Sequence, residues 1–227
     1  GRLLGMREPS PEDLAAYLYA LLSTPAYQER FAAELQTPGP RVPLTRDPAL
    51  WTRAVDIGRR LLWLHTFAER FRDPGAGRDA RVPKVAGLEW VSPVRRMPAT
   101  PRDISYDPAT GQIRVGDGVV AGVRPEVWDY TVSGMQVVSK WLGYRTRSGS
   151  GRVVSSPNPL DKIRPGEWLD AWNDELLDLL RVLTLTVEGF PDQLALLGEI
   201  VSGPLIMAGE LPVPGPEERN PPPTEKR

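Results

Sequence analysis

The side chains best suited to chemistry in this sequence are the cations and aromatics of VWDYTVSGMQVVSKWLGYRTRSGSGR, residues 127–152. Four cations follow one another from Lys140 onward, Asp129 is the single acid, and two Trp and two Tyr are interleaved with them. Guanidinium and ammonium groups are strong donors to phosphate oxygens. A segment of this composition is typical of a surface that faces phosphate groups.

The charge of the whole chain is unevenly distributed. Residues 81–165 contain 13 Lys and Arg against 7 Asp and Glu, whereas the rest of the chain contains 15 against 22. The formal net charge of the 227 residues is −1, so the chain as a whole does not have the composition of a nucleic-acid binder. A basic middle between acidic flanks indicates either a phosphate-facing surface or a solvated loop region that uses Arg. The sequence leaves these two interpretations equally open.

Catalytic residues are hard to find. The absence of cysteine excludes thiolate chemistry, disulfides and cysteine zinc sites, and His65 is the only histidine, so no histidine metal cluster is possible. Two groups of acids lie near expected helix starts, where the helix dipole explains them: Glu12 and Asp13, and Asp174, Glu175 and Asp178. We predict no catalytic residue and no metal site in this chain, and whether the chain is an enzyme stays uncertain.

The first 80 residues have a helical pattern. Ser10 can cap a helix that begins with Pro11, and a second short helix follows Pro25. The apolar spacing in residues 47–71 predicts a long helix. Residues 1–80 are therefore expected to form a helical part.

The character of the chain changes near residue 81. Residues 104–123 alternate apolar and polar side chains around Asp107–Gly111, which predicts short strands joined by a turn. A helix is expected over residues 134–144, with a basic loop after it. Residues 81–165 are thus predicted to be a basic module that contains β-strands.

Two further helices are expected after this module, over residues 165–187 and 191–201. Residues 166–208 would form a C-terminal helical part, and the Pro-rich residues 209–227 would be a disordered tail. We assign the fold class α+β, with helical segments that brace the small β-containing module. The tryptophans at 51, 63, 168 and 172 are expected in the core. The role of those at 90, 128 and 141 is left open, with core packing as the default.

No membrane association is predicted. No apolar run approaches the roughly 18 residues of a membrane helix, and the first residues lack the apolar region of a signal peptide. Together with the absence of cysteine, this favours a cytoplasmic location. The first residue is not Met, so we expect a piece of a longer protein or a processed chain.

Several segments, taken in order, resemble a known family. They are YLYALLSTPAYQERFAAEL, PRVPLT, GRRLLWLHTFAERF, YDPATGQIRV, GVRPEVWDY and KWLGYR, and they span roughly residues 12–205. This ordered set resembles the C-terminal target-recognition region of Type ISP restriction-modification enzymes, bacterial single-chain proteins that contain a nuclease, a translocase, a coupler and an adenine-N6 methyltransferase. Met135 departs from the pattern, because an aromatic residue is expected there after the small-residue turn.

The resemblance implies a function in DNA target recognition for phage defence. Double-stranded DNA would be one partner, and the methyltransferase domain or parent chain would be another. S-adenosylmethionine would bind in that missing methyltransferase domain, and no cofactor is expected in this chain. Arg and Lys would contact phosphates or guanine, and Gln would suit adenine. Our candidates for these contacts are Gln136, Lys140, Arg145, Arg147 and Arg152, with Arg95, Arg96 and Arg102 as a second set that could hold the DNA backbone.

Two other function classes remain open at this point. The chain could be a protein-interaction or coupling module whose basic middle packs on an acidic partner without direct DNA contact. It could also be an enzyme in its own right, although no pair of nucleophile and base is visible. For any single candidate residue, a solvated surface role is as compatible with the sequence as base contact.

Overall fold

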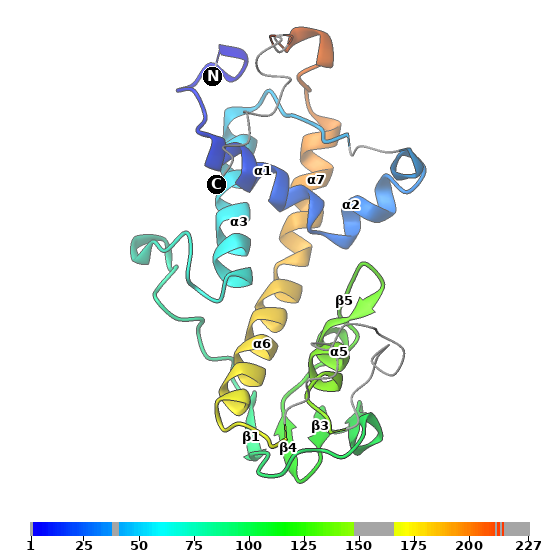
Figure 1. Ribbon diagram of the computed structural model, residues 1–227. Helices are drawn as coiled ribbons and strands as arrows, with labels where there is room; N and C mark the ends of the chain where they lie inside the picture. Colours follow the sequence, from blue (N-terminus) through cyan, green and yellow to red (C-terminus); the bar gives the residue numbers. More distant parts are fainter. Residues whose placement is uncertain (1, 38–40, 148–165, 212, 214, 216–227) are drawn as a thin grey trace, which may run out of the picture. The chain divides into compact units, whose positions relative to one another are not determined.

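The computed structural model describes residues 2–37, 41–147, 166–211, 213 and 215. Within these ranges the fold combines helices with two small antiparallel sheets, which confirms the predicted α+β class. The α-helices are α1 (Pro11–Leu22), α2 (Pro25–Arg30), α3 (Pro48–His65), α4 (Pro125–Trp128), α5 (Val137–Gly143), α6 (Ala171–Glu188) and α7 (Phe190–Ser202). The strands are β1 (Glu89–Ser92), β2 (Ile104–Asp107), β3 (Gln112–Val115), β4 (Gly118–Ala121), β5 (Thr131–Val132) and β6 (Met135–Gln136). Figure 1 shows their arrangement.

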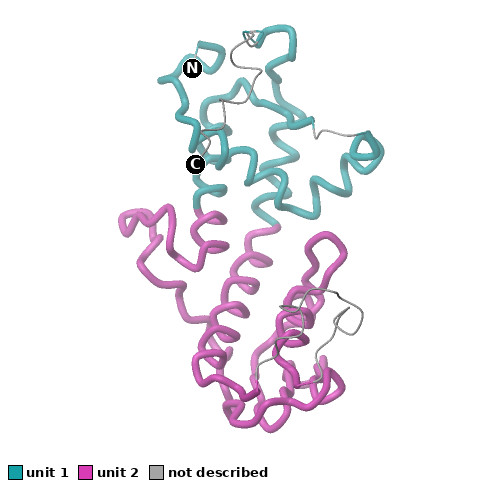
Figure 2. Tube along the Cα trace, viewed as in Figure 1, with its two compact units in different colours: residues 1–59, 191–227 teal, residues 60–190 magenta. Residues whose placement is uncertain are grey.

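The chain divides into two compact units, coloured separately in Figure 2. Unit 1 contains residues 1–59 and 191–227, and unit 2 contains residues 60–190. The predicted basic module, residues 81–165, therefore lies wholly within unit 2. Unit 2 is the part of the chain in which a site built from the predicted residues has to be sought.

Unit 1 is organised around a buried tyrosine. The Tyr17 ring stacks on Trp51 with a centroid distance of 4.4 Å. Its hydroxyl donates to the carbonyl oxygen of Pro43 at 2.8 Å and accepts the N–H of Thr45 at 3.1 Å, and burial raises its pKa to about 12. At the start of α1, Ser10 and Asp13 form a reciprocal capping box, which confirms the helix start predicted from sequence. Tyr17 therefore ties α1 both to α3 and to the connector that precedes it.

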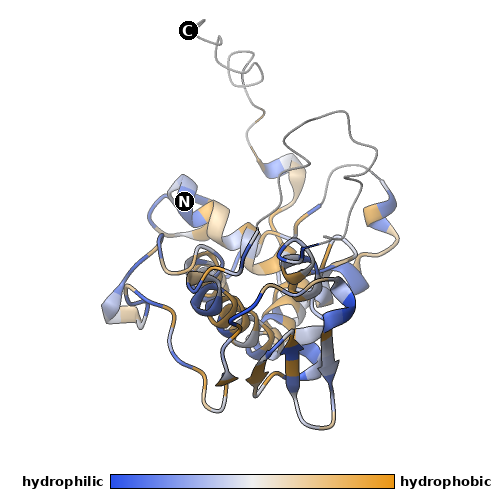
Figure 3. Cartoon of the chain, turned by 60° about the horizontal axis from the view of Figure 1, so that its bottom comes forward, coloured by the Kyte–Doolittle hydropathy of each residue, from blue (hydrophilic) through white to orange (hydrophobic). Residues whose placement is uncertain are grey.

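Unit 2 contains a four-stranded antiparallel sheet in the order β1-β4-β3-β2. One face is apolar and packs against α5 and α6 (Figure 1), with Val138 and Leu142 from α5 and Leu176 and Leu180 from α6 in the same core. Figure 3 shows the hydrophobic residues on these helices and strands. In β2 and β3 the burial alternates, so that Ser105, Asp107 and Arg114 lie on the opposite, solvent face. The sheet thus presents a polar surface on one side and closes a core with the other.

A β-bulge interrupts the edge strand β1. Trp90 pairs with Val120 and Ser92 pairs with Val119, so Val91 between them has no partner in the ladder and is 64% exposed. The chain then continues through Pro93 and the buried Val94 to Arg95 and Arg96. Gly118 allows this approach, because a Cβ at its position would lie 2.7 Å from the backbone nitrogen of Val94. The bulge and the glycine together direct the chain from the sheet edge toward the two arginines.

A single buried side chain, Asn173 of α6, fixes this segment to the core. Its amide nitrogen donates to the carbonyl oxygen of Val94 at 3.1 Å, and its Oδ1 accepts the N–H of Val94 at 3.1 Å. The same Oδ1 accepts the indole N–H of Trp168 at 3.3 Å. Because buried polar groups are costly when unpaired, this network strongly determines where the segment after β1 lies.

Candidate nucleic-acid interface

The predicted helix over residues 134–144 begins later than expected, at Val137. The reason is a hairpin: Thr131 and Val132 pair with Gln136 and Met135, and this pairing withdraws residues 135 and 136 from the helix. Ser133 and Gly134 form the turn with φ of 51° and 76°, a conformation that Gly adopts without strain. All six residues from Thr131 to Gln136 are exposed. The hairpin therefore offers a small, well-defined projection just before α5.

Gln136 and Lys140 lie at the start and in the middle of the α5 region, and both have protein partners. The Gln136 side-chain amide donates to Asp129 Oδ1 at 3.2 Å. Lys140 is half-buried, and its Nζ lies 5.1 Å from the centroid of the Tyr144 ring, which is 51% exposed. Tyr144 was not among the predicted contact residues, although its position four residues after Lys140 places both on one helical face. These side chains are accessible enough to reach a ligand.

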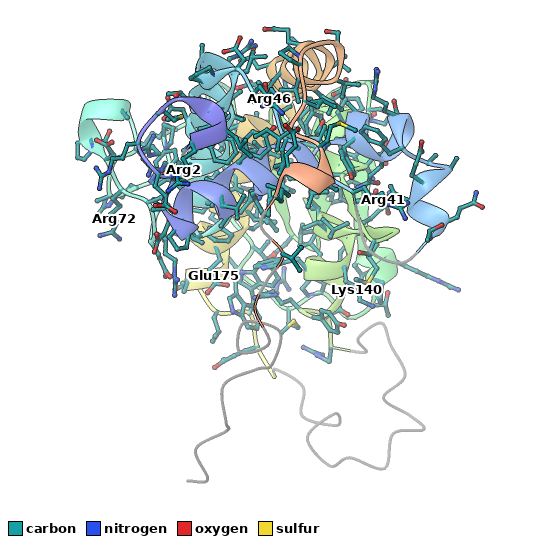
Figure 4. The ribbon with its side chains drawn as sticks, turned by 90° about the horizontal axis from the view of Figure 1, so that it is seen from above. Arg2, Arg41, Arg46, Arg72, Lys140 and Glu175 are labelled. Carbon is teal, nitrogen blue, oxygen red and sulfur yellow. The ribbon has the colours of Figure 1, made fainter. Side chains whose placement is uncertain are left out.

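Arg145 has a different environment from the other predicted cations. Its guanidinium carbon lies 3.5 Å from the centroid of the Trp141 ring and 5.1 Å from that of Trp172. Nη1 donates to the carbonyl oxygen of Trp141 at 3.2 Å, and Nη2 pairs with Glu175 at 3.2 Å. Glu175 is labelled in Figure 4. We refer to Trp141, Arg145, Trp172 and Glu175 as the Arg145 corner.

The packing of the Arg145 corner assigns this arginine mainly to the structure. Its side chain is 22% exposed, and burial lowers its pKa while Glu175 acts in the opposite direction. A guanidinium packed against indole rings contributes to folding mainly through these contacts, because Glu175 is half-exposed and its pairing adds little. The prediction that Arg145 contacts DNA stays a prediction, and its present contacts favour a positioning role.

Arg147 is exposed and lies close to the second predicted set of arginines. Its backbone N–H donates to the carbonyl oxygen of Pro98 at 2.9 Å. Pro98 follows Arg95 and Arg96 directly in the chain after Met97, so the structure brings these segments together from positions about fifty residues apart. Arg152, the remaining predicted cation, lies outside the described residues.

Arg96 and Arg102 line one open depression on the surface of unit 2, with a volume of about 500 Å³. A third arginine, Arg114 of β3, lines it too. The remaining lining residues come from the loop after β1, the 3-10 helix Pro101–Asp103, β2 and the β3–β4 turn: Met97, Pro98, Ala99, Asp103, Ser105, Gly116 and Asp117. We call this feature the arginine depression.

Asp117 holds the loop that carries Arg95 and Arg96. Its Oδ1 accepts the backbone N–H of Arg95 at 3.1 Å and that of Arg96 at 3.3 Å, and its Oδ2 lies 3.4 Å from Arg96 Nε. These donors, that of Arg95 first, lower the pKa of the Asp117 carboxyl, so the group stays ionised at neutral pH. The guanidinium groups of Arg95 and Arg96 remain exposed, with the Arg96 side chain at 87%.

Arg114 was missed in the sequence analysis, although the sequence contains a signal for it. In the predicted strand QIRV, Ile113 and Val115 alternate with Arg114, so the arginine must lie on the face opposite to the core. In the structure it pairs with Ser105 of β2, which lines the same depression. What the sequence could not show is that this face adjoins Arg96 and Arg102.

Other site types find no support in the part of the chain that the structure describes. No group of three or more His, Asp or Glu side chains there is arranged to hold a metal ion. None of the described helices combines the length and apolar character that crossing a membrane requires. The arginine depression and the exposed side chains around α5 are therefore the features on which we base the function.

Comparison with known proteins identifies the family. The family model of the Type ISP C-terminal specificity domain matches residues 4–179, which is more than half of the chain. This chain belongs to the Type ISP C-terminal specificity domain family. The resemblance inferred from the sequence motifs is thereby confirmed.

Two solved structures share the fold of this Type ISP domain. One is a nuclease-deletion mutant of the Type ISP restriction-modification enzyme LlaGI in complex with a DNA substrate mimic, with a TM-score of 0.53 and 20% identity over 81% of this chain. The other is the DrdV–DNA complex, with a TM-score of 0.53 and 22% identity over 86% of this chain. A search of curated proteins found no match.

The matched region is a small part of each of these two proteins. This chain covers 14% of the LlaGI chain and 18% of the DrdV chain. The fold of this region is common to all three, and both complete proteins are several times longer than this chain.

Proposed function

We propose that this chain recognises a target sequence in duplex DNA for a Type ISP-like restriction-modification enzyme. The observation that carries the proposal is the match to the specificity-domain family over residues 4–179. Two structures with the same fold were solved with DNA or a DNA mimic, which supports the same partner for this chain.

The surface of unit 2 is compatible with this function. Arg95, Arg96 and Arg147 are exposed cations on two neighbouring segments, and Arg102 and Arg114 add two more beside them. Cations of this kind neutralise backbone phosphates and give affinity that depends on salt but not on sequence. Sequence would be read by side chains that reach base edges, for which the exposed Gln136 and the α5 residues Lys140 and Tyr144 are candidates.

The chemistry would take place elsewhere in the parent protein. We propose an adenine-N6 methyltransferase domain as the partner that binds S-adenosylmethionine and transfers the methyl group. The role of this chain would be to hold that domain at its target. The proposed location is the cytoplasm, where the DNA of a bacterial cell lies.

Binding of the 227-residue chain to duplex DNA across a salt series tests the proposal. We expect tight binding at low salt that weakens steeply as salt rises, and enrichment of one sequence when a pool of randomised duplexes is selected. A variant in which Arg95, Arg96 and Arg147 are changed to Gln should lower the slope of log affinity against log salt by about 2 to 3, since each lost phosphate contact removes about 0.9.

A matched control changes three exposed arginines of unit 2 outside this surface, Arg60, Arg70 and Arg81, to Gln. It alters the net charge equally and should leave the slope nearly unchanged. Absence of binding by the unmodified chain at low salt would overturn the proposal in favour of a protein-interaction module. Binding without any enriched sequence would overturn target recognition and leave a non-specific DNA binder.

A further inference from the structure

The arginine depression brings together three segments that are separate in the sequence. Arg96 lies after β1, Arg102 lies in the 3-10 helix Pro101–Asp103, and Arg114 lies on the solvent face of β3. Strand pairing fixes Arg114, because it stands opposite Ser105 of β2 and Val119 of β4. The third cation is thus placed by the sheet itself, which holds a side chain more firmly than a loop does.

The two carboxylates in the depression are already occupied by the protein. Asp103 accepts the backbone N–H of Thr100 at 2.8 Å as part of a capping box, and Asp117 accepts the N–H groups of Arg95 and Arg96. These contacts fix the turns on which the arginines lie. The carboxylates therefore act mainly as acceptors for backbone donors and leave much of the guanidinium hydrogen-bonding capacity free.

The guanidinium groups have few partners of their own. Among the described residues, Arg102 and Arg114 form no ion pair, and Arg96 has one long contact of 3.4 Å to Asp117. Guanidinium presents a planar set of N–H donors that matches the oxygens of phosphate. Three arginines that line one open depression can offer such donors to a phosphate oxyanion on the molecular surface.

The charge of the lining selects between phosphate species. Three guanidinium groups and two carboxylates leave one positive charge, which matches the single negative charge of a phosphodiester. A terminal phosphate monoester carries up to two negative charges and would meet the two carboxylates unfavourably. The chemistry of the hollow therefore favours a phosphate within a nucleic-acid backbone.

From this arrangement we infer that the arginine depression binds one backbone phosphodiester of the target DNA and fixes the register in which the domain meets the duplex. The inference rests on the proposed function. It makes Arg114 a DNA-contacting residue and assigns it a phosphate, not a base edge. Contacts of this kind position the protein without carrying sequence information.

Arg114→Gln is the variant that tests the inference, with Arg81→Gln as the control. Both positions are exposed in unit 2, and both changes remove one positive charge. We expect Arg114→Gln to weaken duplex binding about tenfold at low salt and to lower the salt slope by about 0.9. The loss should be the same on the preferred sequence and on random duplexes, because a phosphate contact is independent of sequence. Arg81→Gln should bind as the unmodified chain does.

Arg102→Gln tests the same inference independently, because it removes a different arginine that lines the depression. Thermal unfolding of each variant checks that the fold is intact. If the unmodified chain and Arg114→Gln bind duplex DNA with the same affinity and slope, the inference is overturned while the proposed function stands. If Arg114→Gln loses binding only on the preferred sequence, Arg114 reads a base and the phosphate assignment is wrong. If no protein in the series binds DNA, the proposed function fails and the inference fails with it.

Discussion

The Arg145 corner and the arginine depression use the same residue type for opposite purposes. In the corner, one guanidinium lies between two indole rings and pairs with Glu175, and its side chain is 22% exposed. In the depression, three arginines line an open hollow, and the Arg96 side chain is 87% exposed. The comparison shows that the neighbours of an arginine decide whether it supports the fold or remains available to a ligand.

The largest effect in this comparison should come from Asn173, because both regions depend on it. Asn173→Ala leaves the buried N–H and carbonyl of Val94 and the indole N–H of Trp168 without their partner. We expect a loss of about 3–5 kcal/mol in the free energy of unfolding, measured by urea denaturation. Trp168 packs edge-on against Trp141 and Trp172 of the corner, and Val94 precedes Arg95, so both regions should loosen together. A loss below about 1 kcal/mol would show that water replaces the amide.

Replacing one arginine in each region should change the free energy of unfolding by less, and the two changes should differ. Arg145→Ala is expected to lower the free energy of unfolding by about 2 kcal/mol, mainly because it removes the contacts of a largely buried side chain with the indole rings. Arg114→Ala should stay within about 0.5 kcal/mol, because its side chain is exposed and has no ion-pair partner among the described residues. Chemical denaturation of both variants measures the difference. Equal losses would remove the distinction between corner and depression.

The smallest expected effect is a pH dependence of the free energy of unfolding that comes from His65, a residue outside both regions. The Thr186 hydroxyl donates to the carbonyl oxygen of Val182 at 2.8 Å, so its oxygen can accept from His65 Nε2–H at 2.9 Å. Burial lowers the pKa of His65 below the value of 6.5 for a free histidine. Protonation therefore favours the unfolded state: the stabilisation is fully present above pH 6.5 and is lost as the pH falls through the lower pKa of the folded state.

Unfolding free energies at pH 7.5 and pH 5.5 measure this dependence. We expect the unmodified chain to lose stability between these values and His65→Gln to lose less. The corner and the depression contain no histidine, so we expect their contributions to change little over this range. An identical pH dependence in the two proteins would mean that His65 does not account for it.

Local sequence rules predicted most of the elements in this fold. Ser10 as the cap and Pro11 as the first helical residue located the start of α1, and the alternation around Asp107–Gly111 located β2 and β3. The long helix predicted to Phe71 ends at His65 instead, because Phe67, Ala68 and Phe71 take positive φ values of 51°, 62° and 56° in a compact turn. That turn is stabilised by the burial of Ala68 with Trp63 and Leu64, a tertiary effect that local spacing does not contain.

The candidate site was less predictable than the fold for the same reason. Sequence identified a basic module and the arginines at 95, 96 and 102, but it grouped Arg145 with Arg147 because they are two residues apart. In the structure Arg145 faces two indole rings, and Arg147 is exposed beside Pro98. Arg114 needed the pairing of β3 with β2 before its neighbours were known. Pairwise proximity between distant segments decides these roles, and a single sequence does not contain it.

The bulge at Val91 has a consequence for the behaviour of the chain at high concentration. A regular edge strand presents a row of unpaired N–H and carbonyl groups on which a strand of another molecule can add. In β1 the register shifts between Trp90 and Ser92, and Pro93 follows immediately, so the free edge is short and irregular. The exposed Val91 is therefore poorly placed to extend the sheet into a second copy. The same irregularity that directs the chain toward Arg95 and Arg96 also makes this edge of the sheet unfavourable for intermolecular strand pairing.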